Sequence, residues 1–126
     1  MNTSTKEQII VVGSINTDMV IGANTLPKPG ETLMGHKFFM NPGGKGGNQA
    51  VAAARMGGEV AMIANLGVDV FGDSAIAKLK EEGVNCEGIT RDPDRPSGVA
   101  IINVDDTGEN QIVVAPGANA TLDTDL

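Results

Sequence analysis

The sequence is poor in aromatic residues and in the side chains that build metal or thiol sites. Its 126 residues include no Trp, no Tyr, three Phe, one cysteine (Cys86) and one histidine (His36). A single cysteine excludes an internal disulfide, and these two residues cannot supply the ligand set of a zinc site. Because aromatic residues are scarce, a hydrophobic core has to be built from aliphatic side chains.

Basic clusters and long apolar runs are also absent. The formal net charge is −7, and no run of Lys or Arg occurs. Nucleic-acid-binding proteins usually present a basic face, and a membrane span needs roughly 18 or more apolar residues. The polar start, residues 1–8, lacks the apolar stretch of a signal peptide. We therefore expect a cytoplasmic protein with no nucleic-acid or membrane partner.

Glycine, in contrast, is abundant and clustered. The sequence has 17 glycines among its 126 residues, a share well above the usual one of about 7%. The densest cluster, 43–47, precedes an Ala-rich segment, 48–56, that predicts a helix. Backbone N–H groups at a helix start favour oxygen-rich or anionic ligands. The loop matches neither a Walker A motif nor a dinucleotide fingerprint, and a flexible turn remains the alternative to a binding loop.

The hydrophobic pattern predicts an α/β fold with a mostly parallel sheet. The segments 9–12 and 59–66 are typical of strands buried on both faces, with the helix 48–56 between them. Further predicted elements are short strands at 19–21 and 31–40, a helix at 73–82, a strand or connector at 84–90, and a hairpin formed by 99–104 and 111–115. The segment 119–126 resembles a helix start with Thr121 or Asp123 as N-cap, so we expect the domain to continue.

Polar residues follow the first predicted strand and the glycine cluster. Asn16 and Asp18 come after residues 9–12, and ligands of open α/β sheets bind at the carboxyl ends of strands. Asp accepts hydrogen bonds from hydroxyls, whereas Asn both donates and accepts, so the pair suits a polyol. An Asx turn is the alternative for both residues. Lys45 and Asn48 are further candidates, with a solvated loop lysine and a helix cap as their alternatives.

Six motifs together resemble a known family. They are Gly-Ser-Ile-Asn-Thr-Asp at 13–18, Pro-Gly-Glu-Thr at 29–32, Gly-Gly-Lys-Gly-Gly-Asn-Gln-Ala-Val-Ala at 43–52, Gly-Val-Asp-Val-Phe-Gly at 67–72, Ser-Gly-Val-Ala at 97–100 and Gly-Ala-Asn-Ala at 117–120. In order and spacing they resemble the ribokinase branch of the ribokinase/PfkB family of sugar kinases, over residues 9–122. Gly47 stands where ribokinases often have Ala.

The resemblance implies a partial ribokinase-like fold. Residues 1–126 would be the N-terminal portion of a domain with flanking helices, a small β-sheet lid at about 17–40 and 97–116 inserted in the α/β core, and its C-terminal ATP-binding half absent. Sugar contacts are implied at Asn16, Asp18, Gly44, Lys45 and Asn48, with Ala100, Ile102 and Ile112 as apolar lid contacts. A homodimer through the lid strands is also implied.

The resemblance further implies ATP-dependent phosphorylation of D-ribose at the 5-hydroxyl, with Mg²⁺ and often a monovalent cation. The family's base Asp lies in a Gly-Ala-Gly-Asp stretch, and its magnesium motif is Asn-x-x-Glu. Neither motif occurs in the sequence. We therefore expect a sugar-binding half that has no catalytic residue and binds no cofactor on its own. A noncatalytic sugar-binding or dimerisation module, or a PfkB-type kinase for fructose or a nucleoside, are the alternatives.

Overall fold

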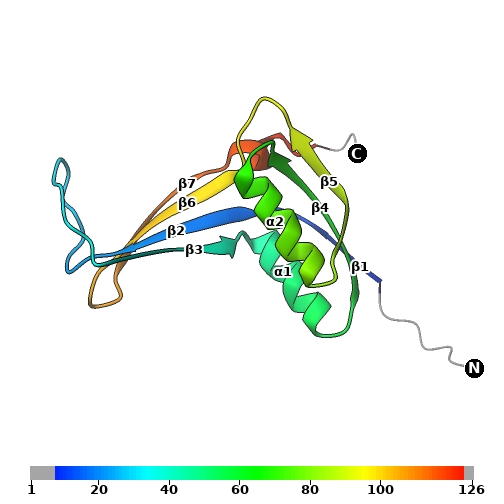
Figure 1. Cartoon of the computed structure of the whole chain (residues 1–126), viewed down its shortest axis with the longest axis horizontal. Helices are drawn as coiled ribbons and strands as arrows, with labels where there is room; N and C mark the ends of the chain where they lie inside the picture. The colour runs from blue at the N-terminus through cyan, green and yellow to red at the C-terminus, as the bar shows by residue number, and fades with distance from the viewer. Residues whose placement is uncertain (1–7, 124–126) are drawn as a thin grey trace, which may run out of the picture.

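A computed structural model describes residues 8–123 and shows two β-sheets that meet at one end, with helices packed on the first (Figure 1). The first sheet is parallel, with strand order β1-β4-β5. Its elements are β1 (Gln8–Val12), α1 (Lys45–Arg55), β4 (Glu59–Gly67), α2 (Val70–Glu81) and β5 (Asn85–Asp92). The predicted α/β class and parallel pairing are confirmed. Neither helix in this part of the chain is long and apolar enough to span a membrane.

The core lies between this parallel sheet and the two helices. Met62 and Leu66 of β4 are its largest fully buried side chains, and Ala50 of α1 and Leu79 of α2 close over them. Successive strand residues point to opposite faces, so Val11 of β1 is buried while Ile10 and Val12 are exposed. Within residues 8–123, no element covers the second face at β1.

The second sheet has four strands in the order β3-β2-β6-β7 and extends from the core as a long arm (Figure 1). Its strands are β2 (Asn16–Gly22), β3 (Lys37–Gly43), β6 (Gly98–Val104) and β7 (Asn110–Ala115). β2 is antiparallel to β3 but parallel to β6, and β6 and β7 form the predicted hairpin. Because β2 follows β1 closely, this arm begins at the carboxyl end of the parallel sheet.

The strands of the arm differ from their predicted bounds. β3 runs from Lys37 to Gly43, whereas 31–40 was expected, because pairing with β2 decides which residues join the sheet. Pro42 is tolerated there because β3 is an edge strand. Asn16 and Asp18 lie within β2, so the Asx-turn alternative for these residues is wrong.

Both helices begin three residues earlier than predicted. In α1 the first turn includes Gly46, and a Cβ atom there would lie 2.9 Å from the Cα of Gly13. Glycine at position 46 therefore allows α1 to pack closely against Gly13, which follows β1. In α2 the N-cap is Asp69, whose side chain accepts a hydrogen bond from the Gly72 N–H at 2.9 Å.

The segment 119–126, where a helix start was expected, is described only as far as residue 123. A short 3-10 helix, η1 (Gly117–Thr121), stands there, and residues 124–126 lie outside the described residues. Thr121 is no N-cap, because its hydroxyl lies 2.7 Å from Asp92 Oδ2 and accepts from Asn65 Nδ2 at 2.8 Å. η1 is thus attached to the carboxyl ends of β4 and β5.

Candidate functional site

The candidate site lies where β2, the end of β3 and the first turn of α1 meet. A Cβ atom on Gly43 would lie 2.5 Å from both carboxylate oxygens of Asp18. A Cβ atom on Gly44, which has φ of 90°, would lie 2.8 Å from the backbone nitrogen of Asn16. Side chains at 43 and 44 would thus collide with β2, so the two glycines allow the turn into α1 to pack directly against Asn16 and Asp18.

Asp18 carries the clearest chemical signal at this junction. Its side chain is half-buried, and within residues 8–123 no hydrogen bond or ion pair engages the carboxylate. Burial raises the pKa of Asp18 above its usual value of 3.8. A partly desolvated carboxylate without a partner costs free energy, and it can accept hydrogen bonds from hydroxyl groups of a ligand.

Lys45 and Asn48 lie on the first turn of α1, which follows Gly43 and Gly44 in the chain. The backbone N–H of Asn48 donates to the carbonyl oxygen of Gly44 at 2.9 Å, as in a regular first turn. Both side chains are exposed, and none of the hydrogen bonds in the described part of the chain involves them. Their ammonium and amide groups are therefore available to a ligand.

The apolar candidates lie on the same face of the arm as Asp18. Ala100 of β6 pairs with Asp18 in register and is buried. Ile102 stands two positions further along β6, opposite Ile112 of β7. Alternate strand residues share a face. The polar candidates therefore lie at the root of the arm, and the apolar candidates follow them outward along the same face.

An open groove of about 920 Å³ lies between α1 and α2. Asn16 and Asn48 lie along it, but Asp18, Gly44 and Lys45 do not. Most of the groove is lined by helix residues such as Val51, Phe71 and Lys78. We place the candidate site at the junction rather than in the groove, because the unpartnered carboxylate lies at the junction.

Sequence reasoning missed Asn119, which lies in η1 and reaches Asn16. Its Nδ2 donates to the side-chain oxygen of Asn16 at 2.9 Å and to the carbonyl oxygen of Ile15 at 3.0 Å. Its Oδ1 accepts from the Ile15 N–H at 3.0 Å. The motif at 117–120 contains Asn119 and could have drawn attention to it. Its partner Asn16 could not be identified from the sequence, because more than 100 residues separate the two.

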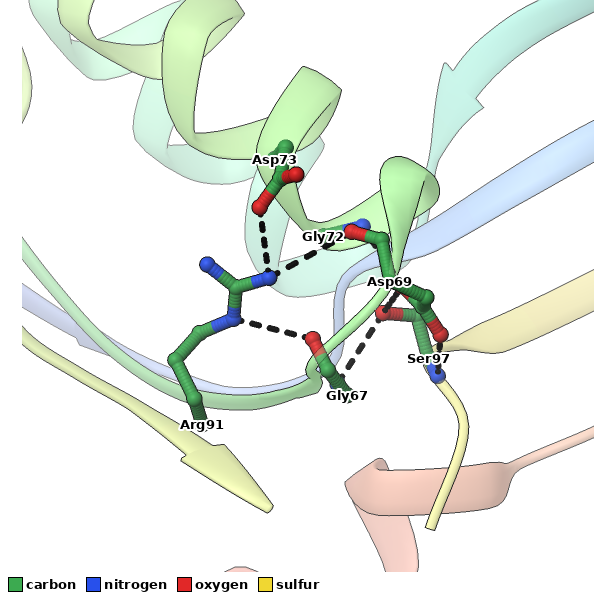
Figure 2. Close-up of polar contacts among 6 residues, drawn as sticks. All are labelled: Gly67, Asp69, Gly72, Asp73, Arg91 and Ser97. Atoms are coloured by element: carbon green, nitrogen blue, oxygen red, sulfur yellow. Dashed lines mark hydrogen bonds and ion pairs between the residues drawn. The ribbon is translucent and has the colours of Figure 1, made fainter. Parts of the chain in front are cut away.

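A second group missed from the sequence anchors the arm to the core (Figure 2). Asp69 Oδ2 accepts from the Ser97 N–H at 2.8 Å, and Asp69 Oδ1 accepts from the Ser97 hydroxyl at 2.7 Å. The Ser97 hydroxyl oxygen accepts from the Gly67 N–H at 3.0 Å. Since Ser97 immediately precedes β6, these bonds tie the root of a sheet strand to the end of β4 and the start of α2.

Arg91 of β5 completes this anchor. Its Nε donates to the Gly67 carbonyl oxygen at 2.9 Å, and a terminal nitrogen lies 2.8 Å from Asp73 Oδ1, as Figure 2 shows. Burial raises the pKa of Asp69, but the hydrogen bonds from Ser97 and Gly72 and the charge of Arg91 outweigh it, so this pKa is lowered overall. Asp69 is therefore held as an anion.

The described residues form no cluster of metal-ligating side chains. Within 8–123 no group of three or more His, Cys, Asp or Glu side chains could hold a metal ion. We therefore assign no metal site and no phosphoryl-transfer step to this part of the chain.

The chain is an α/β protein. Its parallel sheet carries helices on one face and is joined to a β-sheet arm, and the candidate polar residues lie where the two meet. The model of the pfkB family carbohydrate kinases matches residues 6–126. The chain belongs to the pfkB family of carbohydrate kinases, which confirms the resemblance found in its motifs.

Among the relatives of the chain are a mouse ribokinase and a Salmonella typhi deoxyribokinase. The first is 43% identical over 117 residues, covering 93% of this chain and 36% of the relative. The second is 41% identical over 114 residues, covering 90% and 37%. A solved Arabidopsis thaliana ribokinase, complexed with ribose and ATP, matches with a TM-score of 0.83 and 31% identity, covering 91% of this chain and 38% of that one. The chain thus spans little more than a third of the length of these proteins.

Proposed function

We propose that this chain binds the sugar of a ribokinase-type kinase, which phosphorylates D-ribose at its 5-hydroxyl at the expense of ATP. The observation that carries the proposal is the half-buried carboxylate of Asp18, packed against Gly43 and without a partner within residues 8–123. The names of the relatives, ribokinase and deoxyribokinase, support a pentose as the substrate.

Each candidate residue has a role that suits its chemistry. Asp18 accepts hydrogen bonds from sugar hydroxyls, while Asn16, Lys45 and Asn48 donate to sugar oxygens. Gly44 lets the sugar approach the backbone. Ala100, Ile102 and Ile112, on the face that also carries Asp18, cover an apolar side of the sugar.

Phosphoryl transfer belongs, in this proposal, to other parts of a longer protein. The described residues hold no metal cluster, and the sequence lacks the Gly-Ala-Gly-Asp and Asn-x-x-Glu motifs. ATP, magnesium and a monovalent cation would therefore be bound outside residues 8–123. The solved Arabidopsis relative, whose complex contains both ribose and ATP, supports the use of ATP.

The arm is proposed to act as a lid and as the contact of a homodimer. Large apolar side chains are exposed on the face of the arm opposite Asp18, among them Phe38, Ile101 and Val113, and such clusters commonly mark interaction surfaces. A cytoplasmic location and the absence of nucleic-acid and membrane partners stay predictions.

Calorimetric titration of the chain with D-ribose tests the proposal, with and without a nonhydrolysable ATP analogue. We expect weak ribose binding without a nucleotide effect, and its loss in Asp18→Ala. Asp94→Ala, which removes an exposed carboxylate from the loop before β6, is the matched control and should bind normally. Titration with 2-deoxy-D-ribose, fructose and adenosine separates the alternative substrates. A folded chain that binds none of these ligands would overturn the proposal.

A further inference from the structure

The hydrogen bonds of Asn119 determine which way the Asn16 carboxamide faces. The side chain of Asn119 forms two hydrogen bonds with the backbone of Ile15. Its Oδ1 accepts from the Ile15 N–H, and its Nδ2 donates to the Ile15 carbonyl oxygen, each at 3.0 Å. Its Nδ2 also donates to Asn16 at 2.9 Å. These bonds join η1 to the residues where β2 begins.

The polarity of this chain of bonds is set by the backbone. The Ile15 N–H can only donate, so the Asn119 atom that faces it has to be the oxygen. The Asn119 nitrogen then faces Asn16, and since an amide nitrogen only donates, Asn16 has to present its oxygen. The assignment of both carboxamides therefore follows from one backbone N–H group.

The other end of the Asn16 carboxamide is open to a ligand. No hydrogen bond within residues 8–123 engages its Nδ2, and no buried side-chain nitrogen or oxygen in this region lacks a partner. The nitrogen is consequently accessible to solvent. The hydrogen bond between Asn119 and Asn16 requires glycine at position 98, because a Cβ atom there would overlap both the Asn119 nitrogen and the Asn16 oxygen.

We propose that Asn119 is a positioning residue that makes Asn16 a pure hydrogen-bond donor to the substrate. Asp18, two residues further along β2, is a pure acceptor when ionised. The two neighbours then recognise different partners: a sugar oxygen that accepts at Asn16 and a hydroxyl that donates at Asp18. This inference deepens the proposed function and rests on sugar binding at the junction.

Asn119→Asp tests the inference by reversing the polarity. The new carboxylate still accepts from the Ile15 N–H, but its second oxygen opposes both the Ile15 carbonyl oxygen and the Asn16 oxygen. The backbone carbonyl cannot reverse its polarity, whereas the Asn16 carboxamide can, so Asn16 should turn and donate inward. An acceptor would then face the ligand, and D-ribose affinity should fall about tenfold or more, as expected when opposed acceptors replace a hydrogen bond. In an Asn16→Ala background the same substitution should have no further effect.

Side-chain amide NMR signals provide a second readout that does not depend on binding affinity. In the wild-type chain, the Asn119 NH₂ protons should be protected from solvent exchange, whereas those of Asn16 should exchange freely and shift on addition of ribose. In Asn119→Asp the Asn16 protons should become protected. Asn103→Asp, a neutral-to-charged change on β6 whose partner is Gln111, is the control and should alter neither set of signals.

The outcomes separate this inference from the proposed function. Freely exchanging Asn119 protons, or Asn16 protons unchanged in Asn119→Asp, would overturn the inference whether or not ribose binds. Unchanged ribose affinity in a variant whose Asn16 has turned would also overturn it. A wild-type chain with the expected amide signals but no ribose binding would overturn the proposed function and, with it, the specificity role, while the Asn119–Asn16 geometry would stand.

Discussion

The carboxylate of Asp18 lies half-buried against Gly43, and burial raises its pKa because it disfavours the charged form. The folded chain thus holds the Asp18 proton more tightly than the unfolded chain. Charged Asp18 destabilises the fold at pH values above its folded pKa, and this penalty disappears as the pH falls below the usual value of 3.8 that applies to the unfolded chain. A group that costs stability and faces an open junction is typical of a binding site.

Asp18→Asn should therefore stabilise the fold and weaken sugar binding. We expect a gain of about 0.5–1 kcal/mol in the free energy of unfolding near neutral pH, and no gain near pH 3, where the wild-type carboxyl is protonated. Ribose affinity should fall by about tenfold or more. Thermal denaturation at both pH values and calorimetric titration measure the two effects. A less stable variant near neutral pH would contradict this interpretation of Asp18.

At the scale of elements, the first turn of α1 shows that the glycines of the cluster differ in whether alanine could replace them. A Cβ atom on Gly46 would lie 2.9 Å from both Gly13 Cα and Met62 Cε, whereas one on Gly47 would lie 3.8 Å from the nearest atom, in Ile15. Position 46 therefore needs glycine for contact with the core, and position 47 does not.

Gly46→Ala and Gly47→Ala form a matched pair on this turn. Gly46→Ala should destabilise the fold by about 1–3 kcal/mol through overpacking. Gly47→Ala should stabilise it by about 0.5–1 kcal/mol through reduced backbone entropy in the unfolded chain. Urea denaturation of both variants checks the difference. Equal effects at the two positions would show that the approach of Gly46 to Gly13 does not matter.

The anchor formed by Asp69 and Ser97 joins three elements, since it caps α2 and holds the root of β6 beside the end of β4. Hydrogen bonds and Arg91 outweigh burial and lower the pKa of Asp69. Its stabilising contribution is therefore complete above the unfolded pKa of about 3.9 and is lost as the pH falls through the lower folded pKa.

Asp69→Asn should destabilise the chain by about 1–3 kcal/mol near neutral pH. Asn can still cap α2, but its amide nitrogen would face the Ser97 N–H, which then loses its acceptor. The difference from wild type should persist down to about pH 5 and shrink below about pH 4. Denaturation across this pH range measures it, with Asp94→Asn as a control that should show no such trend. A penalty independent of pH would mean that shape, not charge, makes Asp69 effective.

At the scale of the whole molecule, one face of the arm exposes several large apolar side chains, and exposed apolar patches commonly mark interaction surfaces. Val113 of β7 is 71% exposed, and Phe38, Met40 and Ile101, which share its face by strand register, are 44–58% exposed. The parallel sheet has its own exposed pair in Ile10 and Val12 of β1. The arm and this open face are the two surfaces on which association would remove apolar area from water.

Val113→Lys should reduce self-association if the arm forms the homodimer contact. Burying an unpaired ammonium at a contact costs several kcal/mol, so we expect a dimer in the wild-type chain and a monomer in the variant by sedimentation velocity. Val68→Lys, at a valine that is 69% exposed in the loop before α2, is the matched control and should leave the dimer intact. A wild-type chain that stays monomeric at high concentration would refute the dimer.

The sequence by itself determined the α/β class, the parallel pairing of β1 with β4, the hairpin of β6 with β7 and the family. These depend on local patterns: apolar runs, turn residues and motifs of a few neighbouring positions. It also pointed to Asn16, Asp18 and Lys45, although whether they bind sugar stays a prediction. Thr121 as the N-cap of a helix at the end of the chain was wrong, because contacts of Thr121 with Asn65 and Asp92 outweigh its local capping pattern. Asp123 as the N-cap stays a prediction, since residues 124–126 lie outside the described residues.

Only the tertiary structure decided the parallel pairing of β2 with β6, the anchor of Ser97 on Asp69 and the placement of Asn119 against Asn16. Each of these joins residues far apart in the chain. Their geometry depends on the path of everything between them, and no local pattern encodes that path. The direction in which Asn16 offers its amide is therefore a property of the fold, although both asparagines are plainly visible in the sequence.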